Sequence, residues 1–516
     1  MATSSVASPE DGATLRRAAR GSALNLGGSV VSALANLVLT VLITRLVSSQ
    51  DAGVFFSATS LFLLAVAISQ LGTSTGLVYF LSRARAHGEL RHANAYMRTA
   101  MVPVLTAAVL IGALVLLLAQ PLGELLSPGR EEEFAGYMRV MAGFIPCAAV
   151  LQLALAATQG LGTMRPFAVV DHVCRSLLHL LLVGLALMVF HDDAIAWYWS
   201  MAYLPTAVVA WIWWRRLRDR AAPQVKDPTL RPAGPFWRFS APRALANVTQ
   251  VAMQRLDIIL VGALAGLGAA AIYAAATRLL VLGQMIARAV AMSGQPLLGE
   301  SLARPDRSEA RHLYRVTTGW LVAVTWPWYL TLMVWGPVML LVFGEDYSVG
   351  HPALLILGAA MLFATSAGMV DMVLNMGGRS LWNLANVVIA FTANIVIDLM
   401  LIPSLGLLGA AIGWGTAIVL ANLLPLVQVW STLSMNPYGK GTLGAAAAAA
   451  LCFAAVPLAF EAALGPSPAT FLWSFLTAVA LYAPALWFLR RTLELGVFTQ
   501  ALLRRRARTR PVSPEA

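Results

Sequence analysis

Five polar side chains recur at helical spacing within a hydrophobic stretch of the sequence. Arg243, Asn247, Gln250, Gln254 and Asp257 follow one another at intervals of four, three, four and three residues. On a helix these side chains share one stripe. A charged group at the centre of a bilayer costs ~2.5 to 3.5 kcal/mol on insertion scales. We therefore expect the stripe to face a protein interior or a watery cavity, where it could bind a polar ligand.

A second group combines an acid, a base and a histidine. Asp171, Arg175 and His179 stand at i, i+4 and i+8, which lets Asp171 and Arg175 form an ion pair on one helix face. His179 then lies one turn deeper, where titration near neutrality would let it sense or carry a proton. A histidine satisfied within the core is the simpler interpretation of the same position.

The remaining polar groups in hydrophobic stretches fall on three more expected helices. One helix presents four of them on one face, and two others each carry an acid and an amide four residues apart. These residues are Tyr273, Thr277, Gln284 and Arg288; Asp371 with Asn375; and Asn394 with Asp398. Arg278 lies off the face of the first set and could serve packing or a neighbouring acid.

Membrane-spanning helices are the elements that must position these groups. Of the 516 residues 59% are hydrophobic and 12% are charged, and the mean hydropathy is +0.73. Soluble proteins carry roughly 25% charged residues, so we expect an all-α polytopic membrane protein. Stretches of about 20 apolar residues predict fourteen spans, at 22–46, 54–81, 97–119, 137–158, 167–190, 194–214, 236–262, 268–298, 314–342, 351–374, 380–402, 405–433, 441–464 and 468–489.

Basic residues predict the orientation of these spans. They concentrate in segment 1–21, in the loops that follow even-numbered spans and in the tail 490–516. By the positive-inside rule both termini are cytoplasmic. The net charge of +12 then reflects topology and requires no nucleic-acid partner. The basic tail is expected to lie on anionic membrane lipids.

The loops and the cysteines argue against several function classes. The longest loop on the outer side runs from Gln120 to Gly136. This leaves no room for a catalytic domain there, so we expect no enzyme. Cys147, Cys174 and Cys452 fall in predicted spans without metal-ligand spacing and suit small packing residues. We expect no metal and no cofactor.

An internal repeat relates the two halves of the chain. At an offset of 218 residues, Gly53–Leu61 matches Ala271–Leu279. The same offset lays four polar residues of the first span over the start of the stripe at 243–254. These four are Asn25, Ser29, Ser32 and Asn36. The first span therefore carries an uncharged copy of the stripe, and we expect Arg and Asp to concentrate on the second half's wall of any shared cavity.

The repeat predicts two lobes of six helices each. Because six is even, the lobes have the same orientation and are related by a pseudo-two-fold axis along the membrane normal. We place them at 22–214 and 236–433, joined by a cytoplasmic linker at 215–235 and followed by two extra helices at 441–489. Folds of this kind bind substrate between their lobes near mid-membrane and work by alternating access.

Three runs of residues carry a family resemblance. They are Thr44-Arg-Leu-Val-Ser-Ser-Gln-Asp-Ala-Gly-Val-Phe55, Gln254-Arg-Leu-Asp-Ile-Ile-Leu-Val-Gly262 and Ile272-Tyr-Ala-Ala-Ala-Thr-Arg-Leu279. These runs resemble the polysaccharide biosynthesis, or O-antigen flippase, branch of the multidrug/oligosaccharidyl-lipid/polysaccharide (MOP) exporter superfamily. Ala271 stands where a glycine is usual. The resemblance implies a flippase that lies in the cytoplasmic membrane and moves undecaprenyl-diphosphate-linked oligosaccharide from its inner to its outer leaflet, driven by a gradient of H+ or Na+. It also implies polysaccharide polymerases or glycosyltransferases as partners.

Roles for the polar residues follow from that substrate. The planar fork of arginine matches phosphate oxygens, and amides suit sugar hydroxyls, while acids could bind the coupling ion. We expect substrate contacts from Asn25, Asn36, Arg45, Arg175, Arg243, Asn247, Gln250, Gln254, Arg278, Gln284 and Arg288. We expect ion coupling by Asp257, Asp371, His179 and Asp398.

Other interpretations remain open at this stage. Polar residues also join helices to one another, and Arg243 could snorkel to the headgroups. Arg255 and Asp257 are two residues apart and cannot face the same way. The alternative functions are a multidrug and toxin exporter of organic cations, a lipid II flippase of cell-wall synthesis, and a membrane enzyme acting on polyprenyl substrates. Arginines outnumber acids within the spans, which favours an anionic lipid headgroup over a cation.

Overall fold

All regular structure in the described residues is helical. The structure, a computed structural model, describes residues 9–189, 194–223, 232–302 and 306–494. Most of the predicted basic tail and parts of the amino-terminal segment and the linker therefore lie outside the described residues. Thirteen helices are long and apolar enough to cross a membrane, or fourteen if Glu131–Ala142 and Ile145–Gly160, bent by 45°, form one span. This confirms the expected fold class.

The first half contains ten α-helices and a π-helical segment. They are α1 (Pro9–Leu46), α2 (Ser49–Ser69), α3 (Thr73–Ala86), the short η1 (Leu90–His92), α4 (Ala93–Leu117), α5 (Ala119–Leu126), α6 (Glu131–Ala142), α7 (Ile145–Gly160), the π-helix η2 (Phe167–Arg175), α8 (Ser176–Val189), α9 (Ile195–Met201) and α10 (Tyr203–Ala221). Below, α1–α10 are called the N-lobe.

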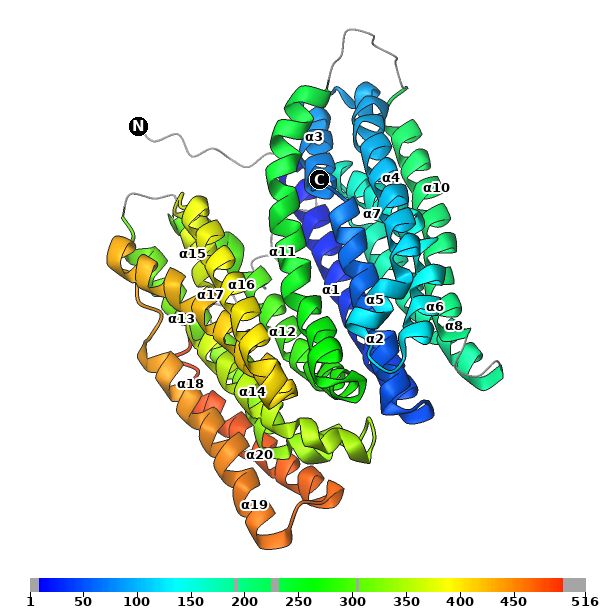
Figure 1. The fold of residues 1–516 in the computed structure, drawn as a ribbon. Helices are drawn as coiled ribbons and strands as arrows, with labels where there is room; N and C mark the ends of the chain where they lie inside the picture. The colour runs from blue at the N-terminus through cyan, green and yellow to red at the C-terminus, as the bar shows by residue number, and fades with distance from the viewer. Residues whose placement is uncertain (1–8, 190–193, 224–231, 303–305, 495–516) are drawn as a thin grey trace, which may run out of the picture.

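The second half begins with three long helices. Its elements are α11 (Ala233–Ala265), α12 (Leu267–Leu302), α13 (Ser308–Leu340), the short η4 (Glu345–Gly350), α14 (His351–Ser366), α15 (Val370–Met376), α16 (Ser380–Leu405) and α17 (Leu407–Leu433), which together are called the C-lobe. The chain continues through α18 (Lys440–Ala450), η5 (Leu451–Ala455), α19 (Val456–Leu464) and α20 (Pro468–Phe488). These last helices pack against α13 on the side away from the N-lobe (Figure 1).

Two predicted spans are broken where glycine adopts a left-handed backbone. Gly72 has φ +73° between α2 and α3, and Gly368 has φ +73° between α14 and α15. A residue without Cβ reaches this region at low cost. The prediction of one continuous helix across 54–81 and another across 351–374 was therefore wrong. Asp371 lies in the short helix α15 and not in a long span.

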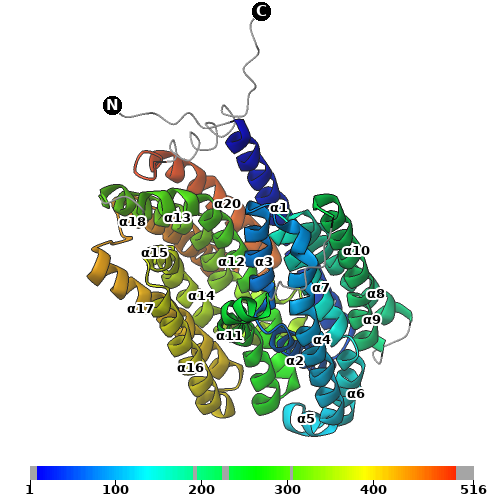
Figure 2. The same ribbon diagram turned by 90° about the horizontal axis from the view of Figure 1, so that it is seen from above.

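Helix α11 passes between the lobes. Near its start Phe236 and Ser240 pack so closely against α3 that a Cβ on Gly76 would meet both. Near its end Asp257 contacts α12 and α16. Figure 1 shows the two lobes diverging at the end where α11 begins, and Figure 2 shows α11 near the centre of the bundle. One helix thus belongs to the N-lobe at one end and to the C-lobe at the other.

The lobes are joined at the opposite end, where α2 and α12 begin. A Cβ on Gly53 of α2 would lie 2.0 Å from the carbonyl oxygen of Leu267, so only glycine permits this approach. The Arg45 guanidinium, at the end of α1, donates hydrogen bonds to the carbonyl oxygens of Val342, at 2.9 Å, and Leu341. These carbonyls follow α13, and Arg45 therefore links the two lobes.

A separate ion-pair network ties the start of α2 to the start of α6 within the N-lobe. Arg130 pairs with Asp51 and with Glu133, each at 2.8 Å. The hydrogen bond with Glu133, together with the charge of Asp51, raises the pKa of the Arg130 guanidinium.

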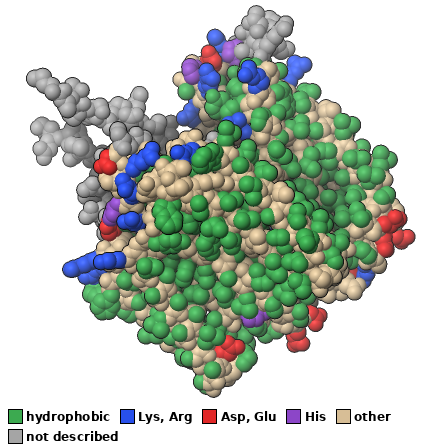
Figure 3. Space-filling model, turned by 60° about the vertical axis from the view of Figure 1, so that its left-hand side comes forward, with side chains coloured by type: hydrophobic (Ala, Val, Ile, Leu, Met, Phe, Trp, Pro, Cys, Tyr) green, Lys and Arg blue, Asp and Glu red, His purple; other side chains and the backbone are tan. Residues whose placement is uncertain are grey.

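The surface has the pattern of a membrane protein. Figure 3 shows a broad hydrophobic face with Lys and Arg side chains gathered toward one end. That distribution supports the orientation expected from the positive-inside rule, in which this end is cytoplasmic. On that orientation, which stays a prediction, the lobes are joined at the outer end and diverge at the inner end.

We predict that Arg45→Ala loosens the joined end. Its guanidinium supplies two charge-assisted hydrogen bonds between the lobes, and losing them should raise the population of states in which the lobes separate there by about tenfold. The reporter is Ser57→Cys, in a background without the three native cysteines, because Ser57 is fully buried beside Gly262 at this contact. The measurement is the rate of maleimide labelling of purified protein.

The matched control is Arg139→Ala. Arg139 is exposed at the same end and donates to Gln120 of its own lobe, so this variant should label at the unaltered rate. Equal rates in the two arginine variants would show that Arg45 does not hold the lobes together.

Candidate functional site

Two polar sites of opposite character flank the second half of α11. Arg255 and Asp257 are two residues apart, so their side chains leave the helix in different directions. Asp257 points into the C-lobe and Arg255 lies toward the N-lobe. The helix therefore separates an acidic site from a basic one.

The acidic site is an enclosed pair of carboxylates. Asp257, Asn394 and Asp398 are 3%, 1% and 1% exposed. The Tyr273 hydroxyl of α12 donates to the Asp257 carboxylate at 2.9 Å, and the Asn394 amide donates to Asp398 at 2.9 Å. The two carboxylates lie within hydrogen-bonding range of each other. The sequence predicted Asp257 and Asp398 separately, and the fold brings them together.

The geometry of this pair depends on helix spacing and on one glycine. Asn394 and Asp398 are four residues apart and so share a face of α16. Gly413 of α17 leaves the space that the Asp398 carboxylate occupies, since a Cβ there would lie 1.9 Å from its Oδ1. Each carboxylate keeps one buried oxygen without a hydrogen-bond partner among the described residues. Two carboxylates this close in an apolar interior need a proton or a cation between them.

The basic site gathers three arginines from both lobes. Arg175 comes from the π-helix of the N-lobe, Arg255 from α11 and Arg278 from α12. Arg255 lies within electrostatic range of both Arg175 and Arg278. All three are partly buried, and the Nε of Arg278 has no hydrogen-bond partner among the described residues.

Only part of this positive charge is balanced. Arg175 donates to the Asp171 carboxylate at 2.9 Å, which confirms the ion pair expected from their spacing. Its guanidinium also lies 5.6 Å from the ring centroid of Tyr203, a favourable cation–π distance. Against three arginines, Asp171 is the one acid that the described residues place in contact with the group. About two positive charges therefore remain unbalanced by acids among the described residues.

His179 lies beside this group in the N-lobe interior. It is 2% exposed, and its ring stacks on Trp199 with centroids 4.8 Å apart. Its Nε2 has no hydrogen-bond partner among the described residues. Packing in the core thus accounts for the position of His179, and one of its ring nitrogens is left without a hydrogen bond from the described residues.

The rest of the polar stripe follows α11 away from Asp257. Gln254 and Gln250 are exposed, Asn247 is half-buried, and Arg243 stacks over the ring of Phe239 at 3.5 Å while donating to that residue's carbonyl oxygen at 2.7 Å. These residues lie on the same helix face as Asp257, which contacts the C-lobe. Gln250 and Gln254 are therefore exposed on the same face of α11 from which Asp257 enters the C-lobe.

The corresponding residues of α1 mainly serve helix contacts. Ser32 shares a hydrogen bond of 2.8 Å with Ser176 of α8, and Asn36 donates to the Ser32 carbonyl oxygen at 2.7 Å. Asn25 is half-buried, and its side-chain oxygen has no partner among the described residues. In this conformation the α1 stripe is turned against the N-lobe's own π-helix and α8.

Four other predicted residues lie apart from both sites. Arg45 joins the lobes at their contacting end, as described above. Gln284 makes a long 3.8 Å contact with the sulfur of Met361 on α14. Arg288 is exposed further along α12, and Asp371 is exposed on α15. The fold brings none of these four to the arginine group or to the carboxylate pair.

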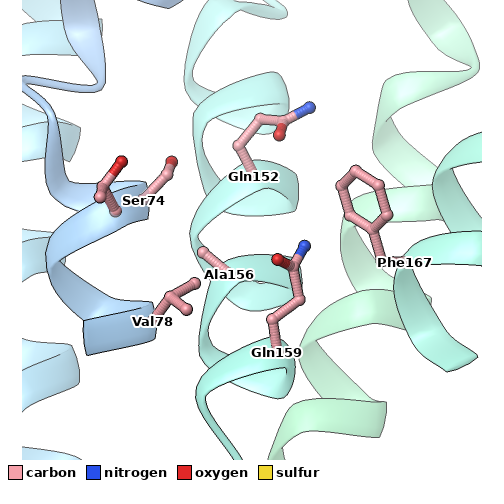
Figure 4. Close-up of a pocket in the computed structure, with 7 residues that line it drawn as sticks. Ser74, Val78, Gln152, Ala156, Gln159 and Phe167 are labelled. Atoms are coloured by element: carbon pink, nitrogen blue, oxygen red, sulfur yellow. The ribbon is translucent and has the colours of Figure 1, made fainter. Parts of the chain in front are cut away.

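The sequence interpretation overlooked a pocket in the N-lobe. A cavity of about 300 Å³ lies between α3, α7 and the start of the π-helix (Figure 4). Its polar lining comes from Ser74, Thr75, Gln152 and Gln159. The spacing of seven between the two glutamines places them on one face of α7, and this pair of amides in a hydrophobic span was the available signal.

Comparison with known proteins identifies the family. The family model described as polysaccharide biosynthesis protein matches residues 18–301, and the MatE model matches residues 242–400. No curated protein matches the sequence.

Solved structures share the fold at low sequence identity. A structure described as the lipid II flippase MurJ in an inward closed conformation has a TM-score of 0.73 at 12% identity, covering 91% of this chain and 99% of that one. An inward-facing multidrug resistance MATE transporter of the MOP superfamily gives 0.64 at 14% identity, covering 78% and 94%. A mutant of the Vibrio cholerae MATE transporter VcmN gives 0.58 at 18% identity, covering 83% and 98%.

We predict that Asp171→Asn destabilises the protein because it leaves Arg175 without its carboxylate. Removing one partner of a largely buried ion pair typically costs roughly 3 kcal/mol. Thermal unfolding of the detergent-solubilised protein should show a clearly lower Tm. Asp219→Asn is the control, because Asp219 is 59% exposed where it pairs with Arg218 and should cost under about 1 kcal/mol. Equal Tm values for both variants would contradict a structural role for the Asp171 pair.

Proposed function

This chain belongs to the polysaccharide biosynthesis protein family within the MOP superfamily of membrane transporters, and from that premise we propose that it flips a lipid-linked oligosaccharide. The substrate is an undecaprenyl-diphosphate-linked oligosaccharide, moved from the inner to the outer leaflet of the cytoplasmic membrane. Alternating access between the N-lobe and the C-lobe carries it across.

The arginine group is the observation that carries this proposal. Arg175, Arg255 and Arg278 converge from both lobes with about two positive charges unbalanced. A diphosphate diester carries two negative charges, and guanidinium groups bind phosphate oxygens through paired hydrogen bonds. Because the arginines come from both lobes, a bound diphosphate would contact both and would respond to their relative movement.

The carboxylate pair is the proposed coupling site. Asp257 and Asp398 supply hard oxygen ligands, Asn394 adds an amide, and two carboxylate oxygens lack partners. Such a set suits Na+ or a proton. Binding there would change the charge on the C-lobe face of α11, the helix that carries Arg255 on its other side. Ion occupancy and phosphate binding would then be linked through one helix.

Exposed or half-buried polar residues along α11 and α12 complete the proposed path. Gln250, Gln254 and Asn247 on α11, and Arg288 on α12, would meet sugar hydroxyls or phosphate as the headgroup passes. Polymerases and glycosyltransferases are the proposed partners, because they consume and supply such lipids.

The second candidate function is export of organic cations. The MatE match to residues 242–400 and the buried carboxylate pair both favour it. A cation bound at the acids would, however, leave the neighbouring arginine group without a role. A lipid II flippase is a variant of the main proposal with a different oligosaccharide.

We predict that Arg255→Ala and Arg278→Ala each lower translocation at least tenfold, because each removes charge-assisted contacts with the diphosphate. Proteoliposomes would contain the polyprenyl-diphosphate oligosaccharide, and its appearance on the far side would be followed with a membrane-impermeant glycosidase. Arg139→Ala, on the outer surface of the N-lobe, should transport normally. Unchanged transport in both site variants would refute the site, and transport of tetraphenylphosphonium in place of the lipid would refute the function.

We predict that Asp398→Asn abolishes the response of translocation to an imposed ion gradient. Neutralising one acid removes the need for a proton or cation at the pair. Transport would be measured with a Na+ gradient, with a pH gradient and with neither. Asp371→Asn is the control, because Asp371 is exposed and distant from the pair. A variant that still responds to the same gradient as the wild type would place coupling elsewhere.

A further inference from the structure

The N-lobe pocket lies on the inner half of the lobe, away from both sites described above. It is formed where α3, α7 and the π-helix meet, beside the end of the bundle at which the lobes diverge. Its volume of about 300 Å³ is at the lower end of the range for small-ligand sites. This is room for a sugar unit but not for a whole oligosaccharide.

The pocket offers hydrogen-bonding groups without charge. The carboxamides of Gln152 and Gln159 project from one face of α7, and Phe167 lies across from them (Figure 4). Neither carboxamide has a hydrogen-bond partner among the described residues, and both are half-buried. An amide both donates and accepts, as a sugar hydroxyl does. The ring of Phe167 supplies an apolar face of the kind on which a pyranose packs.

A second cavity adjoins this pocket and has the opposite character. It measures about 580 Å³ and shares Thr75 and Val78 with the first. Arg83 and Arg243 lie in its lining, together with Tyr79. The Tyr79 ring stacks on Phe239 at 4.2 Å, next to Arg243, which already stacks on the same phenylalanine. The two arginines are thus set against an aromatic wall beside a neutral polar pocket.

We infer that these two cavities form a loading site for the glycosylated lipid, with a neutral sugar in the glutamine pocket and the diphosphate between Arg83 and Arg243. The order of the cavities matches the covalent order of the ligand, in which the first sugar is joined directly to the diphosphate. This inference rests on the proposed function. It adds a carbohydrate subsite and makes the sugar next to the phosphate the unit that the N-lobe recognises.

The lining predicts which sugars the subsite accepts. Among the seven residues of the first pocket none is charged, so an acidic sugar would lose hydration there without gaining a counter-ion. Glucose or another neutral hexose suits the pocket, and a uronic acid does not. An organic cation is equally disfavoured, because the pocket has no carboxylate.

The test is a set of binding titrations on the full-length protein in nanodiscs. The probes are undecaprenyl diphosphate and undecaprenyl diphosphate carrying one glucose. The wild type should bind the glucosylated lipid about tenfold more tightly. Gln152→Leu and Gln159→Leu should each weaken binding of the glucosylated lipid about fivefold and leave the bare diphosphate unaffected. Arg243→Ala should weaken both lipids alike.

Two further variants test whether the effects are specific to the glutamine pocket. Gln50→Leu, at an exposed position on α2, is the control for a glutamine-to-leucine change and should bind both lipids normally. Gln159→Glu keeps the side-chain shape but adds a negative charge, and should reject a glucuronic acid on the diphosphate more strongly than glucose. Thermal unfolding of each variant establishes that it is folded.

The failures of the two proposals are distinguishable. If the wild type binds both lipids but the glutamine variants keep its preference for glucose, the subsite is overturned and the flippase proposal stands. If the wild type binds neither lipid, or binds tetraphenylphosphonium in preference to both, the proposed function is overturned and the subsite falls with it.

Discussion

Helix α11 must hold a cation and an anion two residues apart inside a bundle that is otherwise apolar. Each charge would cost several kcal/mol without compensation, and one partner cannot serve both because their side chains point in different directions. The fold therefore supplies separate surroundings. Tyr273, Asn394 and Asp398 enclose Asp257 on the C-lobe side, and Arg255 lies toward Tyr203 and Arg175 of the N-lobe. The positions of α10, α12, α16 and the π-helix around α11 all serve this requirement.

This arrangement offers a physical route for coupling. The start of α11 packs on α3 and its end packs on α12 and α16, so a change in how the lobes meet must move or bend it. Pro242, inside the helix and near its N-lobe contacts, removes one backbone hydrogen bond and eases such bending. A ligand shifts an equilibrium only through its different affinity for the two states. The ion and the diphosphate that we propose would bind on opposite sides of one helix, and they would meet that condition when the helix adopts a different position in each state.

The sequence predicted the helical fold because hydrophobic length alone determines spans, and it identified Asp257, Asp398 and Arg175 because polar groups at membrane depth are costly. It could not pair Asp257 with Asp398, since that contact joins α11 to α16 and depends on the space left by Gly413. The interruptions at Gly72 and Gly368 were also missed, because hydropathy continues unbroken across them. The guanidinium of Arg45 is a group that can bind phosphate, but at the end of α1 it donates its hydrogen bonds to backbone carbonyl oxygens of the other lobe. Helix periodicity indicates which residues share a face but does not indicate what lies opposite.

The contacts at the joined end combine a close backbone approach, two hydrogen bonds and apolar packing. Gly53 lets α2 meet the backbone of Leu267 without an intervening side chain, and around this point one apolar core spans α2, α11 and α12. Arg45 binds two carbonyls at a helix end, groups that water can satisfy once the lobes part. The hydrogen bonds of Arg45 can thus be exchanged for water, whereas the apolar core loses buried area when the lobes separate, so a ligand that favours the separated state has to offset that loss.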